Sequence, residues 1–121
     1  MDLKAATDAL AALAQETRLR AFRLLVAAGP EGLAAGEIAR QLDVPANTLS
    51  THLAILSNAG LAGSRRESRS ILYAADYDGM RALLEYLVRD CCNGRPEACA
   101  DLLNAIAPSA CCPPAEPRSP S

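Results

Sequence analysis

Two short helical patterns separated by a very tight turn are the feature that most constrains how this chain folds. Residues 34–42 predict a short helix and residues 45–58 a longer one, because apolar side chains recur in both at intervals of three or four positions. The side chains expected to face inward are Ile38, Ala39, Leu42, Leu49, Leu53 and Leu56. Asp43 and Val44 form a tight connection, and Pro45 suits the first position of the second helix. A short helix, a tight turn and a longer helix are typical of a helix-turn-helix.

Amphipathic helices are also predicted on both sides of this pair, at residues 2–14, 16–28 and 77–90. Their apolar residues recur at intervals of three and four. These residues are Leu3, Ala6, Leu10, Leu13, Ala14, Leu19, Phe22, Leu25, Val26, Met80, Leu83, Leu84, Leu87 and Val88. Gly and Pro at 29–30 end the second helix, and Asp76 suits the N-cap of the helix at 77–90.

The segment that follows the helix-turn-helix changes character. Gly60 is expected to end the preceding helix. Residues 61–64 and 70–73 are short runs typical of strands, and the polar residues 65–69 between them predict a turn. The expected fold class is therefore mainly α with a small β-hairpin, in the order of a winged helix-turn-helix.

The distribution of charge is more informative than its total. The 121 residues carry a net charge of −2, which alone does not suggest a nucleic-acid binder. Residues 15–73, however, hold seven arginines against five acidic residues, whereas residues 74–121 hold four against seven. Arginine suits bidentate contacts to phosphate. No stretch approaches the roughly 18 apolar residues of a membrane-spanning helix, and no secretory signal is recognised at the start, so a cytoplasmic protein without membrane contact is expected.

The helix at 45–58 carries the best candidates for reading DNA. In a helix-turn-helix the second helix enters the major groove, and its first two turns face the base edges. The residues expected to contact DNA from this helix are Asn47, Thr48, Ser50, Thr51 and His52, joined by Arg65, Arg66 and Arg69 of the hairpin. Asn47 suits an adenine edge, and the hydroxyls suit phosphate or base. The alternative is that the helix residues are ordinary caps and that the basic hairpin tip is only a solvated turn.

Three segments resemble the arsenical-resistance repressor (ArsR/SmtB) family of winged-helix regulators. Residues 49–61 resemble that family's recognition helix and its exit, S-x-H-L-x-x-L-x-x-A-G-L. Residues 14–20 resemble its Asp-Pro-Thr-Arg-Leu segment, although Gln-Glu at 15–16 stands in place of Asp-Pro. Residues 65–73 resemble its wing. The resemblance covers about residues 8–92.

This resemblance implies a homodimer that binds double-stranded operator DNA and releases it when an ion binds. It also implies that the first and last helices of the domain pair across a two-fold axis, a role that suits residues 77–92. Many members of the family bind metal through Cys-x-Cys in the third helix, but Ala34 and Gly36 occupy the matching positions. His52 matches a family position of the DNA-binding helix. It is also the single histidine of the chain, which excludes a His-rich zinc site.

All five cysteines lie between positions 91 and 112. Cys91, Cys92 and Cys99 are predicted to meet at the end of the last domain helix and to bind arsenite or antimonite, because neighbouring thiols favour soft ions and these ions prefer three sulfurs. Cadmium, lead and a methylated trivalent arsenical are alternatives, and so is a thiol-redox switch. Buried structural cysteines are the remaining interpretation. For Cys111 and Cys112 an added ligand, a shuttle and no role at all stay open.

The resulting hypothesis is an arsenic(III)-responsive transcriptional repressor rather than an enzyme. Residues 1–93 are expected to form the DNA-binding and dimerisation domain, residues 94–107 a C-terminal helix that completes the inducer site, and residues 108–121 a flexible tail rich in proline and serine. No glycine-rich phosphate loop is present, His52 has no plausible nucleophile partner outside its own helix, and no organic cofactor is expected.

Overall fold

The computed structural model describes residues 1–89 together with residues 97 and 100. The chain divides into two compact units, residues 1–87 and residues 88–121. In the second unit, Glu97 and Ala100 are helical. The rest of the helix predicted at 97–107 and the tail predicted at 108–121 lie outside the described residues.

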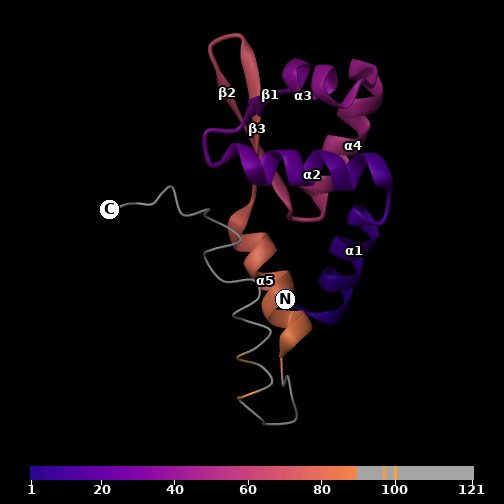
Figure 1. Cartoon of the computed structure of the whole chain (residues 1–121), viewed down its shortest axis with the longest axis vertical. Coiled ribbons are helices and arrows are strands. Elements are labelled where there is room, and N and C mark those ends of the chain that lie inside the picture. Colours follow the sequence, from indigo (N-terminus) through magenta and orange to yellow (C-terminus); the bar gives the residue numbers. More distant parts are fainter. Residues whose placement is uncertain (90–96, 98–99, 101–121) are drawn as a thin grey trace, which may run out of the picture. The chain divides into compact units, whose positions relative to one another are not determined.

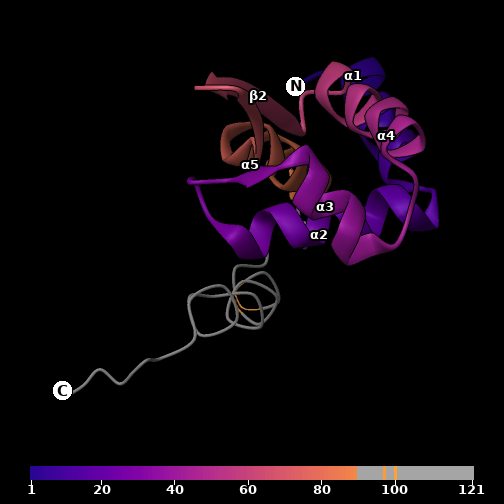
Figure 2. The same ribbon diagram turned by 90° about the horizontal axis from the view of Figure 1, so that it is seen from above.

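The first unit is mainly helical with a small antiparallel sheet, as the sequence predicts (Figure 1). Its elements, in chain order, are α1 Leu3–Leu13, α2 Glu16–Ala28, β1 Leu33–Ala34, α3 Ala35–Leu42, α4 Ala46–Asn58, β2 Ala62–Glu67, β3 Ser70–Ala75 and α5 Tyr77–Val88. Helix α3 lies over α2 (Figures 1 and 2). None of the helices described in this part of the chain combines the length and hydropathy that crossing a membrane requires.

The turn between α3 and α4 is set by a left-handed residue. Asp43 has a φ of 56° and ends α3, while the amide of Val44 donates to the carbonyl of Ala39 at 3.1 Å. Aspartate tolerates this conformation better than most residues because its short polar side chain bonds locally. Pro45 lies just before α4 rather than at its first position, so the predicted start is wrong by one residue. The helix-turn-helix itself is confirmed.

The core is built around α4. Its three inward leucines, Leu49, Leu53 and Leu56, are at most 1% exposed and form one cluster with Leu25 of α2 and Ile38 of α3. Burying a leucine side chain contributes about 1.5–3 kcal/mol. These contacts pack the inner face of α4 against the rest of the unit and leave its outer face to solvent.

Helix α1 packs through alanines rather than through its leucines. Ala6, Ala9 and Ala12 are buried, whereas Leu3 and Leu10 are 69% and 43% exposed. The apolar pattern that predicts α1 is therefore divided between two faces. Small side chains on the buried face allow the helix backbone to approach its neighbours closely, and the leucines remain on the outer face.

The wing is a longer and tighter hairpin than the sequence predicts. Strands β2 and β3 pair from Ala62↔Ala75 to Glu67↔Ser70, so the turn contains only Ser68 and Arg69. Ser68, with a φ of 56°, supplies the positive φ that a tight two-residue hairpin needs. The prediction that residues 65–69 form the turn is wrong, because backbone pairing continues through the exposed charged residues of β2.

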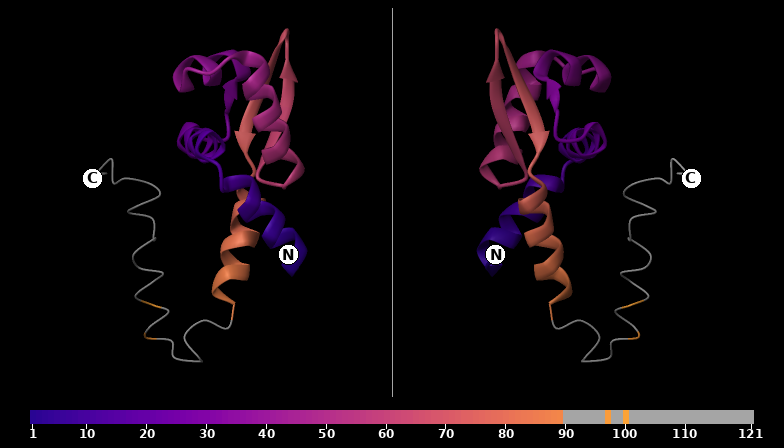
Figure 3. Two further views of the ribbon diagram at one scale, coloured as in Figure 1. Left: turned by 90° about the vertical axis from the view of Figure 1, so that its right-hand side faces the viewer. Right: turned by 90° about the vertical axis from the view of Figure 1, so that its left-hand side faces the viewer.

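A third strand, β1, is not predicted from the sequence. Its two residues pair with β3, Leu33↔Tyr73 and Ala34↔Leu72, which gives the strand order β1-β3-β2. Two residues are too few to show an alternating pattern. Figure 3 shows that the tip of the hairpin and the start of the chain lie at opposite ends of the first unit.

Candidate nucleic-acid interface

The outer face of α4 is polar and open to solvent. Asn47, Thr48, Ser50 and Thr51 are all exposed, while the leucines between and beyond them are buried. The helical period of 3.6 residues produces this division. The hydroxyl of Thr51 donates to the carbonyl of Asn47 at 3.4 Å, and the other three side chains have no hydrogen-bond partner within residues 1–89. These four residues, predicted from the sequence, are brought together on one surface.

The N-terminus of α4 adds a partial positive charge to this surface. Pro45 makes no side-chain cap, and the first intrahelical bond of the helix is donated by the amide of Leu49 to the carbonyl of Pro45. The amides of Ala46, Asn47 and Thr48 therefore lack an intrahelical acceptor. Such amides, together with the helix dipole, attract phosphate.

His52 differs from its neighbours on α4. Its side chain is half-buried, and its Nδ1 atom is buried with no hydrogen-bond partner in the described part of the chain. The interpretation of His52 as an outward residue equivalent to Asn47 or Ser50 is therefore too simple. The imidazole lies at the border between the polar face of α4 and the core.

The three arginines of the wing, which the sequence analysis groups as DNA contacts, differ in their partners in the structure. The side chains of Arg66 and Arg69 are exposed and make no ion pair or hydrogen bond within residues 1–89. Arg65 is also exposed, but its Nη2 donates to the carbonyl of Glu31 at 2.8 Å and its Nη1 to that of Pro30 at 3.4 Å. Its Nε lies 3.6 Å from Oε2 of Glu67. Two of the three guanidinium groups are thus free to meet a phosphate.

A charged cluster on α3 adds to the features that the sequence analysis does not predict. Arg40 donates from Nε and Nη2 to the two carboxylate oxygens of Glu37, at 3.0 and 2.5 Å, and Gln41 donates to the same carboxylate at 2.7 Å. These hydrogen bonds, from Arg40 first and Gln41 second, lower the pKa of Glu37 from 4.5 to about 2. The spacing of three and four residues along a helix is the signal that predicts such a cluster.

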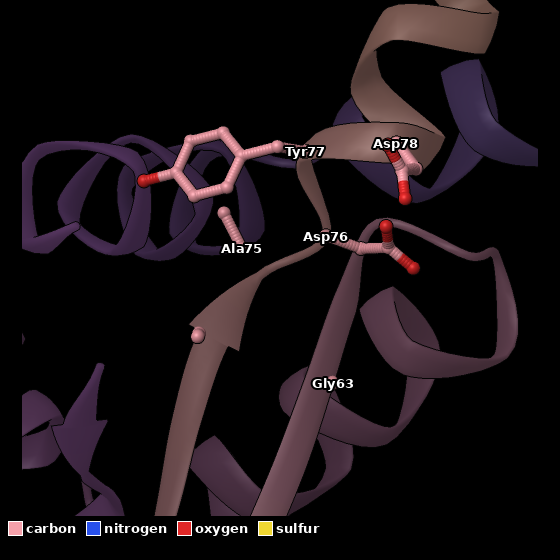
Figure 4. Close-up of a pocket in the computed structure, with 6 residues that line it drawn as sticks. Gly63, Ala75, Asp76, Tyr77 and Asp78 are labelled. Carbon is pink, nitrogen blue, oxygen red and sulfur yellow. The ribbon is translucent and has the colours of Figure 1, made fainter. Parts of the chain in front are cut away.

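A different surface lies where the hairpin meets α5. A shallow hollow of about 360 Å³ is lined by residues 63 and 74–78 (Figure 4). Its two carboxylates have partners: Asp76 accepts from the amide of Gly79 at 3.0 Å and so caps α5 as predicted, and Asp78 pairs with Arg81 at 2.6 Å. The exposed carboxylates make this hollow unsuitable for a nucleic-acid phosphate.

The predicted inducer site cannot be described in the same way. Cys91, Cys92 and Cys99, as well as Cys111 and Cys112, lie outside the described residues. Within the described residues there is no group of three or more potential metal ligands. The cysteine site stays a prediction.

Comparison with known proteins identifies sequence relatives among transcriptional regulators. A helix-turn-helix domain family matches residues 13–62. The transcriptional activator HlyU of Vibrio cholerae is 32% identical over 83 residues, which are 69% of this chain and 74% of HlyU. The regulator YgaV of Escherichia coli is 32% identical over 87 residues, which are 70% of this chain and 88% of YgaV.

Solved structures agree with these relatives. A homodimeric winged helix-turn-helix DNA-binding domain from Mycobacterium bovis, described as a possible ArsR-family transcriptional regulator, has a TM-score of 0.58 and 28% identity, covering 73% of this chain and 82% of that one. A structure described as reduced HlyU from V. cholerae has a TM-score of 0.56 and 30% identity, covering 74% and 90%.

Proposed function

Because the chain belongs to the ArsR-type family of winged helix-turn-helix transcriptional regulators, we propose that it is a repressor that binds operator DNA as a homodimer and releases it when trivalent arsenic binds its cysteines. The observation that carries the DNA-binding part is the polar, uncapped N-terminal face of α4, accompanied by two wing arginines without partners.

The recognition helix is assigned to the major groove. Asn47 presents an amide suited to an adenine edge, and Thr48, Ser50 and Thr51 present hydroxyls suited to bases or phosphates. Arg66 and Arg69 reach the neighbouring backbone or the minor groove. In a dimer, two α4 helices enter successive major grooves about 34 Å apart, which fits an imperfect inverted repeat.

The dimer is proposed to form through α1 and α5. Leu3 and Leu10 of α1 and Leu84 and Leu87 of α5 are between 43% and 69% exposed. Four exposed leucines on the two helices that lie at the end of the unit opposite the hairpin tip suit a buried contact with a second copy. The homodimeric structural neighbour from M. bovis supports this arrangement.

The inducer site is proposed at Cys91, Cys92 and Cys99. Cys91 follows the last residue of α5, Val88, by three positions, so the thiols are connected directly to a dimer helix. Arsenite and antimonite are each bound by three thiolates. Binding of either ion reshapes the end of α5 and thereby changes the separation of the two α4 helices in the dimer. A ligand acts only through its difference in affinity for the two states, and a coupling of about 2–3 kcal/mol releases most of the operator.

A thiol-redox response is the second candidate. Cys91 and Cys92 are adjacent and suited to oxidation. A solved structure of the relative HlyU is described as its reduced form. HlyU is also named an activator, so repression by this chain is part of the proposal and does not follow from the relative.

One titration tests these proposals. The reduced full-length protein is mixed with a fluorescent duplex selected from a random-sequence library, and arsenite, methylarsenite, cadmium, zinc or peroxide is added. Release by arsenite, and not by zinc or peroxide, is the expected result. Release by peroxide alone would establish the redox alternative, and failure to select any duplex would overturn the DNA-binding proposal.

A further inference from the structure

We propose that Arg65 is a positioning residue that fixes the wing relative to the rest of the unit, and that it does not contact DNA itself. The inference rests on the proposed function, because it assigns Arg65 a role within the operator-binding surface. We call the contact of Arg65 with the carbonyls of Pro30 and Glu31 the Arg65 clasp.

The clasp joins two elements that do not pair with each other. Arg65 is on the edge strand β2, and residues 30–31 lead into the other edge strand, β1. Strand β3 lies between them: Leu72 pairs with Arg65 on one side and with Ala34 on the other. The guanidinium therefore ties together the two edges of the sheet, across its central strand.

The loop that receives Arg65 has a fixed conformation. Gly29 and Gly32 have φ values of 86° and 77°, and the amide of Gly32 donates to the carbonyl of Gly29 at 3.1 Å. A Cβ atom at position 32 would overlap the carbonyl of Tyr73 in β3. Because the loop is held against the sheet in this way, the carbonyls of Pro30 and Glu31 are presented at defined positions. A planar guanidinium, with its fork of donors, bonds both.

The surroundings of Arg65 argue against a phosphate contact. Glu67 lies two residues further along β2, on the same face of the strand, and its carboxylate is 3.6 Å from the Arg65 guanidinium. A phosphate approaching Arg65 would meet this carboxylate, and the guanidinium already uses two of its five N–H donors on the carbonyls of residues 30–31. Arg66 projects from the opposite face of β2 and has no partner in residues 1–89, so it presents an unpaired charge.

The first test needs no DNA. Hydrogen–deuterium exchange is measured on the full-length wild-type protein and on the variants Arg65→Lys, Arg65→Gln and Arg66→Gln. Arg65→Lys keeps the positive charge, but its single ammonium group lacks the fork of donors with which the guanidinium bonds both carbonyls. Both Arg65 variants are expected to increase exchange in β2–β3 and at residues 30–33, whereas Arg66→Gln leaves it unchanged. Unchanged exchange in both Arg65 variants would overturn the clasp.

The second test uses the duplex selected by the wild-type protein. Arg65→Lys and Arg65→Gln are both expected to lower affinity about ten-fold, whereas Arg66→Lys keeps most of it. In a protein that already carries Arg66→Gln and Arg69→Gln, the further change Arg65→Gln is expected to alter neither the affinity for the duplex nor its salt dependence. If Arg65→Gln instead flattened the salt dependence in that background by a further ~0.9, Arg65 would contact a phosphate directly. If no duplex is selected, the proposed function fails while the exchange measurement still decides the clasp.

Discussion

The hydroxyl of Tyr77 donates a hydrogen bond to the backbone carbonyl of Val26 at 3.0 Å. Tyr77 is the first residue of α5, and Val26 lies in the last turn of α2. Figure 4 shows the Tyr77 ring directed away from the side chains of Asp76 and Asp78. The bond therefore ties the helix that leads to the cysteines to a helix that packs against α4.

Tyr77→Phe removes this bond and leaves a helix-end carbonyl without its donor. We expect the free energy of unfolding to fall by about 1 kcal/mol, the usual contribution of one such hydrogen bond. Urea denaturation of the two proteins measures the difference. Tyr73→Phe is the matched control, because Tyr73 is also half-buried and its hydroxyl has no hydrogen-bond partner within residues 1–89. Equal stability of Tyr77→Phe and the wild type would show that water replaces the bond.

Gly79→Ala should be far more damaging than another glycine-to-alanine change in a helix. A Cβ atom at Gly79 would overlap the carbonyl of Gly60, which is backbone and cannot move aside cheaply. We expect a loss of at least about 2 kcal/mol, comparable with overpacking a core. Gly36→Ala in α3 meets no atom within 4 Å and should stabilise by about 0.4–1 kcal/mol. Thermal unfolding of both variants checks this, and similar melting temperatures would refute the close approach.

These glycines illustrate what the sequence predicts and what it does not. Gly60 is expected to end a helix, and it does so with a φ of 80°, because that requirement is local. Gly79 carries no such signal: its lack of a side chain matters only once α5 packs against the end of α4. The helix-turn-helix is predictable for the same local reason, since Leu49, Leu53 and Leu56 recur with the period of a helix.

The candidate site likewise contains residues whose placement the sequence predicts and a contact that it does not predict. The exposure of Asn47, Thr48 and Ser50 follows from the helical period, so those residues are predictable. The hydrogen bonds from Arg65 to the carbonyls of residues 30–31 join parts of the chain that are 34 and 35 positions apart in the sequence. No local pattern reveals such a contact.

Glu37 makes stability depend on pH in the acid range. Its pKa is lowered from 4.5 to about 2 by hydrogen bonds from Arg40 and Gln41. A folded-state pKa below the unfolded value stabilises the protein above about pH 4.5, and this contribution is lost as the pH falls towards 2. Glu37→Gln should therefore flatten the dependence of unfolding free energy on pH in that range. Glu85→Gln, an exposed change on α5, is the control, and an NMR midpoint of Glu37 near 4.5 would contradict the argument.

Leu84→Glu/Leu87→Glu should convert the proposed dimer into a folded monomer. The two leucines are 44% and 52% exposed, so charging them costs the isolated unit little, whereas two carboxylates in a dimer contact would be buried without partners. Sedimentation velocity gives the oligomeric state, and circular dichroism shows whether the fold is kept. Leu19→Glu, at an equally exposed leucine of α2, should remain dimeric. A double variant that still sediments as a dimer would place the contact elsewhere.

Cys91→Ser and Cys99→Ser should each keep operator affinity and weaken release by arsenite. A serine hydroxyl replaces the thiol at nearly the same volume, so α4 and the wing are undisturbed, but arsenite keeps only two of its three sulfur ligands. The arsenite concentration for half-release should rise at least about ten-fold, measured by fluorescence anisotropy on the duplex selected by the wild type. Cys112→Ser is the control, because a three-thiol site at Cys91, Cys92 and Cys99 needs no sulfur from the last ten residues. Unchanged release in Cys91→Ser would remove that residue from the inducer site, and lost release in Cys112→Ser would add one to it.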